Sequence, residues 1–264
     1  MKDINQIASL PKITTKQKEI LLLLYKFRFL TTNHFVKLFN HKDPHRIKEW
    51  LSDLIEKDCI RRNYDRKSFG DNTKPAVYYL APKARLVLKK EKELDFSELE
   101  YIYKEKKRTK KFIDHSLFLA DVYLFLLSQK SAKEEIKFFT KGELHRYEYF
   151  PDPMPDAFIS AKGDDKTRRY FLDVFDDFVP PFVLRKRVRM YLEYVEKPDW
   201  DEKTSYTTFP SILFICSNEQ AKRHVYKYTK ALFEKTYEDK LKLFLTTKAR
   251  IEVGEKNNIW QKVA

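Results

Sequence analysis

The chain has 264 residues, which is long enough for two domains of ordinary size. Its 53 Lys and Arg residues outnumber 39 Asp and Glu residues, so the net charge is +14 and the sequence predicts a polyanionic partner. The 42% of hydrophobic residues exclude a wholly disordered chain. Four glycines without phosphate-loop spacing exclude P-loop and dinucleotide sites, so we expect no nucleotide partner. Without a signal peptide or an apolar run of about 20 residues, we expect a cytoplasmic protein with no membrane partner.

The positive charge is concentrated in the first part of the chain. Residues 1–111 contain 27 basic and 15 acidic side chains, whereas residues 112–264 contain 26 and 24. A polyanion is therefore expected to bind the N-terminal part.

Cys59 and Cys216 stand apart in apolar surroundings, which predicts two small core residues in a reducing compartment rather than a disulfide or a zinc site.

Three helices and a hairpin are predicted in the N-terminal part. Thr14 and Thr15 begin a helix that ends near Phe29, and Thr31 and Thr32 begin a second, short helix. Asp43 and Pro44 open a third helix, which ends near residue 57. Two strand-like runs, 59–64 and 76–80, are separated by a basic, turn-rich segment and predict a hairpin.

This order of elements predicts a winged helix-turn-helix domain over residues 1–88. Its third helix would enter the major groove of double-stranded DNA, and the hairpin would follow the phosphates. We expect the DNA contacts to come from polar residues of the third helix and the hairpin, namely His45, Arg46, Lys48, Ser52, Arg61, Arg62, Arg66, Lys67 and Lys74. Two alternatives stay open: these charges only solvate a surface helix, or the domain binds RNA or protein.

A second domain is predicted after a charged helical connector at residues 89–111. The connector has no apolar stripe, so we expect it to be solvent-exposed. Residues 112–264 alternate helix-like and strand-like runs, which predicts a mixed α/β domain and an α+β protein overall. The expected helices are 112–128, 184–195 and 220–237, and the expected strands are 136–139, 157–161, 169–175, 211–216 and 241–245.

Two carboxylates of the second domain form a candidate metal site. Asp156 and Asp173 flank a predicted hairpin that brings them to one end of a sheet, and paired carboxylates suit Mg²⁺. The pattern resembles PD-(D/E)xK nucleases, in which these residues would be catalytic metal ligands. The Lys expected two positions after the second acid is replaced by Phe175, so Lys186 or Arg185 of the next helix would have to supply the charge. A nuclease-like fold that does not cleave, and carboxylates that only cap turns, are the alternatives.

The combination of motifs resembles the replication-relaxation family of bacterial plasmids and integrative elements. The motifs are a Tyr-bearing strand, a helix near a His, a Pro-Asp pair, a Phe-Leu-acid strand and a basic helix leading to a Tyr, here Val77–Pro82, His115–Leu117, Pro155–Ala157, Phe171–Asp176 and Arg185–Tyr191. Two positions depart from the family pattern: Asp173 replaces the usual Glu, and Ala84 replaces the expected Gly.

The resemblance implies a role in plasmid replication, maintenance or transfer, and the basic residues predict a DNA-binding protein. Because the Lys of the nuclease pattern is absent, we expect a second domain that does not cleave. A homodimer and replication or transfer proteins are the implied partners beside DNA. Two other functions stay open: a Mg²⁺-dependent nickase or endonuclease using Asp156, Asp173 and Lys186, and a winged-helix transcriptional repressor.

Overall fold

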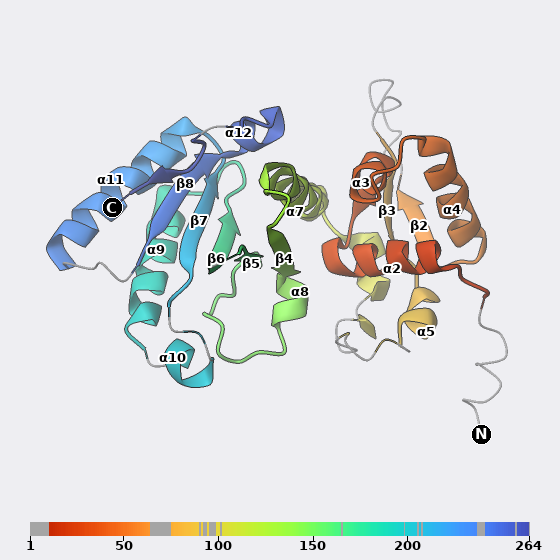
Figure 1. Cartoon of the computed structure of the whole chain (residues 1–264), viewed down its shortest axis with the longest axis horizontal. Helices are drawn as coiled ribbons and strands as arrows, with labels where there is room; N and C mark the ends of the chain where they lie inside the picture. The colour runs from red at the N-terminus through yellow and green to blue at the C-terminus, as the bar shows by residue number, and fades with distance from the viewer. Residues whose placement is uncertain are drawn as a thin grey trace. The chain divides into compact units, whose positions relative to one another are not determined.

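The computed structural model describes most of the chain and divides it into two compact units, Met1–Ala120 and Asp121–Ala264. The described residues are 11–63, 75–89, 91, 94, 99–100, 102–164, 166–197, 199–204, 206, 208–236, 241–256 and 258–263. Both units combine helices with a β-sheet (Figure 1), so the expected mixed α+β class is confirmed.

The N-terminal unit contains helices and a small antiparallel sheet with strand order β1-β3-β2. Its elements in chain order are α2 (Thr15–Phe27), β1 (Leu30–Thr31), α3 (Thr32–Leu38), α4 (Pro44–Glu56), β2 (Ile60–Asn63), β3 (Val77–Leu80), α5 (Ala84–Leu88) and the 3₁₀ helix η2 (Ile102–Lys107). Helix α7 (Lys110–Gln129) follows and spans the boundary between the units.

The helix starts follow the predicted capping chemistry. The Thr14 side chain accepts from the backbone amide of Gln17, and the Thr31 side chain accepts from the amide of His34. Asp43 caps α4 by accepting from the amide of His45, next to Pro44 in the first turn. These caps satisfy backbone donors that have no partner inside the helix, so the three predicted starts are confirmed.

Strand β1 is an element that the sequence did not predict. Helix α2 ends at Phe27, and Arg28 follows with a φ of 68°. The chain then turns into β1, where Leu30 and Thr31 pair with Tyr78 and Val77 of β3. A strand of two residues is too short for an alternating pattern to reveal it.

The C-terminal unit is built on a six-stranded mixed sheet with strand order β4-β5-β6-β7-β8-β9. Strands β4 to β6 are antiparallel, β6 to β8 are parallel, and β9 pairs antiparallel with β8. Its elements after α7 are β4 (Glu135–Thr140), α8 (Lys141–Leu144), β5 (Ala157–Lys162), β6 (Thr167–Val174), α9 (Pro181–Val195), α10 (Asp199–Lys203), β7 (Ser211–Cys216), α11 (Glu219–Thr236), β8 (Leu243–Thr247), α12 (Lys248–Val253) and β9 (Gln261–Lys262).

One face of this sheet forms the main core of the C-terminal unit. The inward side chains alternate along the strands, as Phe171 and Phe214 illustrate, and they pack against Val188 and Tyr191 of α9. Helix α11 lies beside α9 and contacts β7 and β8 (Figure 1). Because strand side chains alternate between faces, the residues between these positions lie on the opposite face of the sheet.

The two cysteines are buried core residues. Cys59 and Cys216 are both fully buried and free. Burial raises the pKa of the Cys216 thiol to about 12 and also raises the pKa of Cys59. Both thiols therefore stay protonated at neutral pH.

We expect neither cysteine to react with Ellman's reagent in the native protein, because only the exposed thiolate is nucleophilic. Both should react once guanidinium unfolds the chain, giving the 2 thiols of the sequence. The absorbance of the released thionitrobenzoate measures this. Rapid release of one equivalent from the native protein would contradict the buried positions.

Candidate functional site

Helix α4 presents a polar face on the N-terminal unit. Ile47, Leu51 and Leu54 are fully buried at a spacing of three and four residues. The predicted DNA-contacting residues of this helix are all exposed, namely His45, Arg46, Lys48 and Ser52. The sequence pattern therefore placed the buried and the exposed sides of α4 correctly, while their contacts with DNA stay a prediction.

Arg46 and His45 share a carboxylate on this face. Arg46 Nη1 lies 2.9 Å from Glu49 Oε2, and His45 Nε2 lies 3.3 Å from Glu49 Oε1. The Arg46 guanidinium also lies 5.7 Å from the ring centroid of Trp50. Because these side chains are exposed, such an ion pair contributes about 0–1 kcal/mol and opens at little cost. Arg46 can therefore leave Glu49 for another anionic partner at little cost.

The predicted hairpin is described only at its base. Arg62 is exposed on β2, and Arg61 is half-buried with its guanidinium 3.7 Å from Asp58. The two strands pair antiparallel, with Arg61 opposite Tyr79 and Arg62 opposite Tyr78. The other predicted contacts, Arg66, Lys67 and Lys74, lie outside the described residues.

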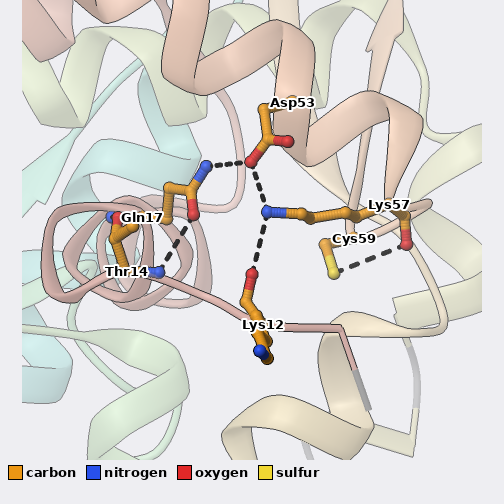
Figure 2. Close-up of polar contacts among 6 residues, drawn as sticks. All are labelled: Lys12, Thr14, Gln17, Asp53, Lys57 and Cys59. Atoms are coloured by element: carbon orange, nitrogen blue, oxygen red, sulfur yellow. Dashed lines mark hydrogen bonds and ion pairs between the residues drawn. The ribbon is translucent and has the colours of Figure 1, made fainter. Parts of the chain in front are cut away.

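A polar network fixes α4 against α2 (Figure 2). The Gln17 amide donates to the Asp53 carboxylate, and the Lys57 ammonium donates both to Asp53 and to the backbone carbonyl of Lys12. The hydrogen bond from Lys57 is the main cause that lowers the pKa of Asp53. Through these contacts the end of α4 is tied to the start of α2, which sets the orientation of the exposed face.

The predicted metal-binding carboxylates meet at one end of the C-terminal sheet. Ala157 pairs with Leu172 across the β5–β6 hairpin, so Asp156 and Asp173 are at adjacent positions. Asp156 Oδ2 accepts from the backbone amide of Val174 at 2.8 Å. The Asp156 charge also contributes to raising the pKa of Asp173. The hairpin therefore brings the two acids together, as the spacing suggested.

Asp173 is held by a buried arginine that the sequence analysis did not single out. Arg187 of α9 donates from Nε to Asp173 Oδ2 at 2.9 Å and from Nη2 to Oδ1 at 2.7 Å. The Tyr191 hydroxyl donates to Asp173 Oδ2 at 2.7 Å. Arg187 Nη1 also donates to the backbone carbonyl of Pro153. These contacts form a closed cluster of Asp173, Arg187 and Tyr191, the Asp173 cluster.

Burial dominates the electrostatics of the Asp173 cluster. Burial raises the pKa of the Asp173 carboxyl, and Arg187 opposes this by charge attraction and by donating to it. Burial, the largest single effect, lowers the pKa of Arg187, but the charge and hydrogen bond of Asp173 together with the charges of Tyr191 and Asp156 raise it above its ordinary value. Burial also raises the pKa of Tyr191 well above its ordinary value, and Asp173 adds to this effect. Tyr191 therefore remains a neutral hydrogen-bond donor.

In this arrangement a guanidinium occupies the place where a cation would bind Asp173. Both carboxylate oxygens of Asp173 accept from Arg187, whereas Lys186 is exposed on the same helix. Among the described residues, no three His, Cys, Asp or Glu side chains form a group that could hold a metal ion. As the side chains are placed here, the donor set does not fit Mg²⁺, and catalysis by Asp156, Asp173 and Lys186 stays a prediction.

A signal for Arg187 is present in the sequence. Leu184, Arg187, Val188 and Tyr191 recur at three and four residues along α9, and all four are buried. A basic residue in an apolar helical row indicates a buried charge that needs a partner. Arg187 falls on the buried row at this spacing, and this distinguishes it from the basic residues beside it in the helix.

The fold and the two candidate sites define a two-unit α+β protein with an exposed polar helix face and a buried acid cluster. Residues 21–211 match the replication-relaxation family, described as "Replication-relaxation". The chain belongs to the replication-relaxation family. A search of curated proteins finds no match. Among the described helices, none combines the length and apolar composition needed to cross a membrane.

Two solved structures are similar to the chain at a low level. One is the restriction endonuclease FokI, with 14% identity, 91% of this chain covered and a TM-score of 0.32. The other is FokI bound to DNA, with 12% identity, 90% of this chain covered and a TM-score of 0.32. The matches cover 43% and 44% of those chains, so this chain spans less than half their length. A TM-score this low does not establish a shared fold.

Proposed function

We propose that the protein binds double-stranded DNA of a plasmid or integrative element, in its replication, maintenance or transfer. The N-terminal unit is the DNA-binding part and is a winged helix-turn-helix domain. The observation that carries the proposal is α4, which buries its apolar row and exposes His45, Arg46, Lys48 and Ser52. Membership in the replication-relaxation family supports the biological role.

The order of elements in the N-terminal unit supports a winged helix-turn-helix. Helices α2, α3 and α4 precede the β2–β3 pair, and β1 completes a three-stranded antiparallel sheet. In such a domain the last helix enters the major groove, which is about 12 Å wide. Helix α4 has 13 residues and is about 20 Å long, so its first two turns reach base edges while its end stays anchored through Asp53 and Lys57.

The charge distribution supports a phosphate-rich partner for this unit. Residues 1–111 contain 27 basic and 15 acidic side chains. Arg61 and Arg62 at the hairpin base add to the two cations of α4, Arg46 and Lys48, and phosphate contacts of this kind fix the register of a protein on DNA. Arg46 and Lys48 are placed to read bases, because arginine and lysine donate to guanine in the major groove.

A salt titration tests this function. With about six phosphate contacts, log K should fall against log salt with a slope of about −5, or roughly 10³-fold between about 50 and 200 mM salt. Fluorescence anisotropy of a labelled duplex, selected by the protein from a random pool, gives the affinity. An affinity that does not change with salt would refute the proposal.

Substitutions on α4 test the predicted contacts. Arg46→Ala should weaken binding to the selected duplex by about 1–3 kcal/mol and relax its sequence preference. Lys106→Ala is the matched control, because Lys106 is an exposed basic residue of η2 in the same unit but outside α4 and the hairpin. Equal loss in both variants would show that only net charge matters, which contradicts a role for α4.

A further inference from the structure

A large cavity borders the starting ends of β6, β7 and β8 in the C-terminal unit. Its volume is about 1230 Å³, and it is lined entirely by residues of the C-terminal unit. Ile159, Tyr170, Leu213 and Phe244 line it from the sheet face opposite α9, because their strand neighbours Phe158, Phe171 and Phe214 pack in the core. Val195 of α9 and Trp200 line it from the core side. Helix α7 covers part of the face, since Leu126 also lines the cavity. We call it the sheet cavity.

The sheet cavity is strongly basic. Lys166, Lys197 and Lys242 line it with exposed side chains, and within the described parts of the chain none of them forms an ion pair. Arg168 also lines the cavity and is paired with Glu134 at 2.7 Å. Glu134 is the one acidic residue among the described lining residues. The cavity therefore has an excess of positive charge that an anionic ligand would neutralise.

Two buried nitrogen donors of the cavity lining have no hydrogen-bond partner in the described structure. They are Arg169 Nε and Trp200 Nε1, and the Trp200 side chain is 1% exposed. The Arg169 guanidinium lies 3.5 Å from the ring centroid of Tyr206. Trp200 packs against the rings of Phe171 and Phe209, and Arg169 shares a face of β6 with Phe171, so both donors lie on the core side of the sheet.

Aromatic rings accompany the positive charge. Tyr170, Phe244 and Trp260 line the cavity and are partly exposed. Rings of this kind beside lysines and arginines are the combination with which proteins bind unpaired bases, because the bases stack on the rings while the cations contact phosphates. A paired duplex has no exposed base faces and would leave these rings unused.

We propose that the sheet cavity binds a single-stranded nucleic acid. Its volume exceeds the roughly 300–1,000 Å³ of sites for small ligands, which favours a polymer segment. This site is separate from the duplex-binding face of α4 and does not depend on it.

The affinity of the full chain for a labelled oligothymidylate of about twelve nucleotides tests the proposal. Replacing Lys197→Glu and Lys242→Glu together should weaken binding at least about tenfold, because two phosphate contacts become repulsive. The matched control is Lys227→Glu with Lys230→Glu, two exposed lysines of α11 outside the cavity lining, which should change the affinity less than about twofold. Both double variants change the net charge equally.

Tryptophan emission gives a second measurement. Two of the three tryptophans, Trp200 and Trp260, line the cavity. Stacked bases should quench the emission of the partly exposed Trp260 on titration with oligothymidylate, and Trp260→Phe should remove most of the quenching. Phe244→Ala should weaken binding by about 5-fold or more through the loss of a stacked base. Circular dichroism melts confirm that each variant is folded.

The possible outcomes separate the proposal from its alternatives. Tight binding of oligothymidylate or oligouridylate supports it, and comparison of the two shows whether the strand is DNA or RNA. Equal weakening in the cavity and control variants would overturn it, because the effect would be one of net charge. Binding of polyglutamate in place of both oligonucleotides would also overturn it and identify an acidic protein segment as the ligand.

Discussion

Replacing Arg187 by methionine is expected to destabilise the C-terminal unit by about 3–5 kcal/mol at neutral pH. The substitution keeps much of the apolar volume but leaves the Asp173 carboxylate buried without its cation. Lys186→Met is the matched control, because Lys186 is the adjacent basic residue of α9 and is exposed. It should change stability by no more than about 0.5 kcal/mol. Urea denaturation followed by circular dichroism measures both.

The loss of stability in the Arg187→Met variant should depend on pH. Burial raises the pKa of Asp173, and the variant lacks the cation that lowers it. A carboxyl whose folded pKa is above its unfolded value favours folding when protonated, and this contribution is lost as pH rises through the folded pKa. The difference in free energy of unfolding between the wild type and the variant at the same pH should therefore be smallest near about pH 4 and grow toward neutral pH. A deficit that is constant over this range would contradict a buried, uncompensated Asp173.

Replacing Arg28 by leucine is expected to lower the free energy of unfolding by about 3 kcal/mol. This loss should be larger than the loss from replacing its partner Glu105. Glu105 of η2 is 5% exposed, and its Oε1 pairs with Arg28 and lies 3.7 Å from Arg108 Nη2. Both guanidiniums also lie over the Phe112 ring, at 5.0 and 4.6 Å from its centroid. Removing Arg28 leaves the buried Glu105 carboxylate with Arg108, at 3.7 Å, as its remaining cation among the described residues. Removing Glu105 leaves two arginines that reach water.

Three variants measure this asymmetry. Glu105→Leu should cost about 1 kcal/mol, because the arginines are partly exposed and are rehydrated. The double variant Arg28→Leu with Glu105→Leu should be more stable than Arg28→Leu alone, since the buried charge is gone. Thermal unfolding of all three with the wild type gives the comparison. A larger loss for Glu105→Leu than for Arg28→Leu would contradict burial as the cause.

Much of the secondary structure could be predicted because apolar spacing and capping residues are local. The helix over residues 44–57 corresponds to α4, and the apolar run at residues 211–216 is β7 with the same bounds. The short elements β1, α8, α10 and β9 were missed, because each has only two to five residues and no complete period. Their formation depends on pairing and packing with distant parts of the chain.

The candidate sites could be predicted only in part, for a physical reason. Exposure of Arg46 and Lys48 follows from the period of their own helix, so the sequence was sufficient. Arg187 pairs with Asp173 on another element, and such pairing depends on how α9 lies on the sheet. The segment at residues 89–111 was expected to be exposed, yet Ile102 and Glu105 are buried there. Glu105 finds arginines that the sequence could not assign to it.

The two outer strands of the six-stranded sheet limit how the protein can associate. Strand β4 has charged, exposed Glu135 and Lys137 along its length, and β9 is a two-residue strand whose Gln261 and Lys262 are exposed. Charged and very short outer strands discourage backbone pairing with another sheet. Copies of the six-stranded sheet are therefore protected from joining strand to strand into a continuous ribbon, and high local concentration should not promote fibrous aggregation through these edges.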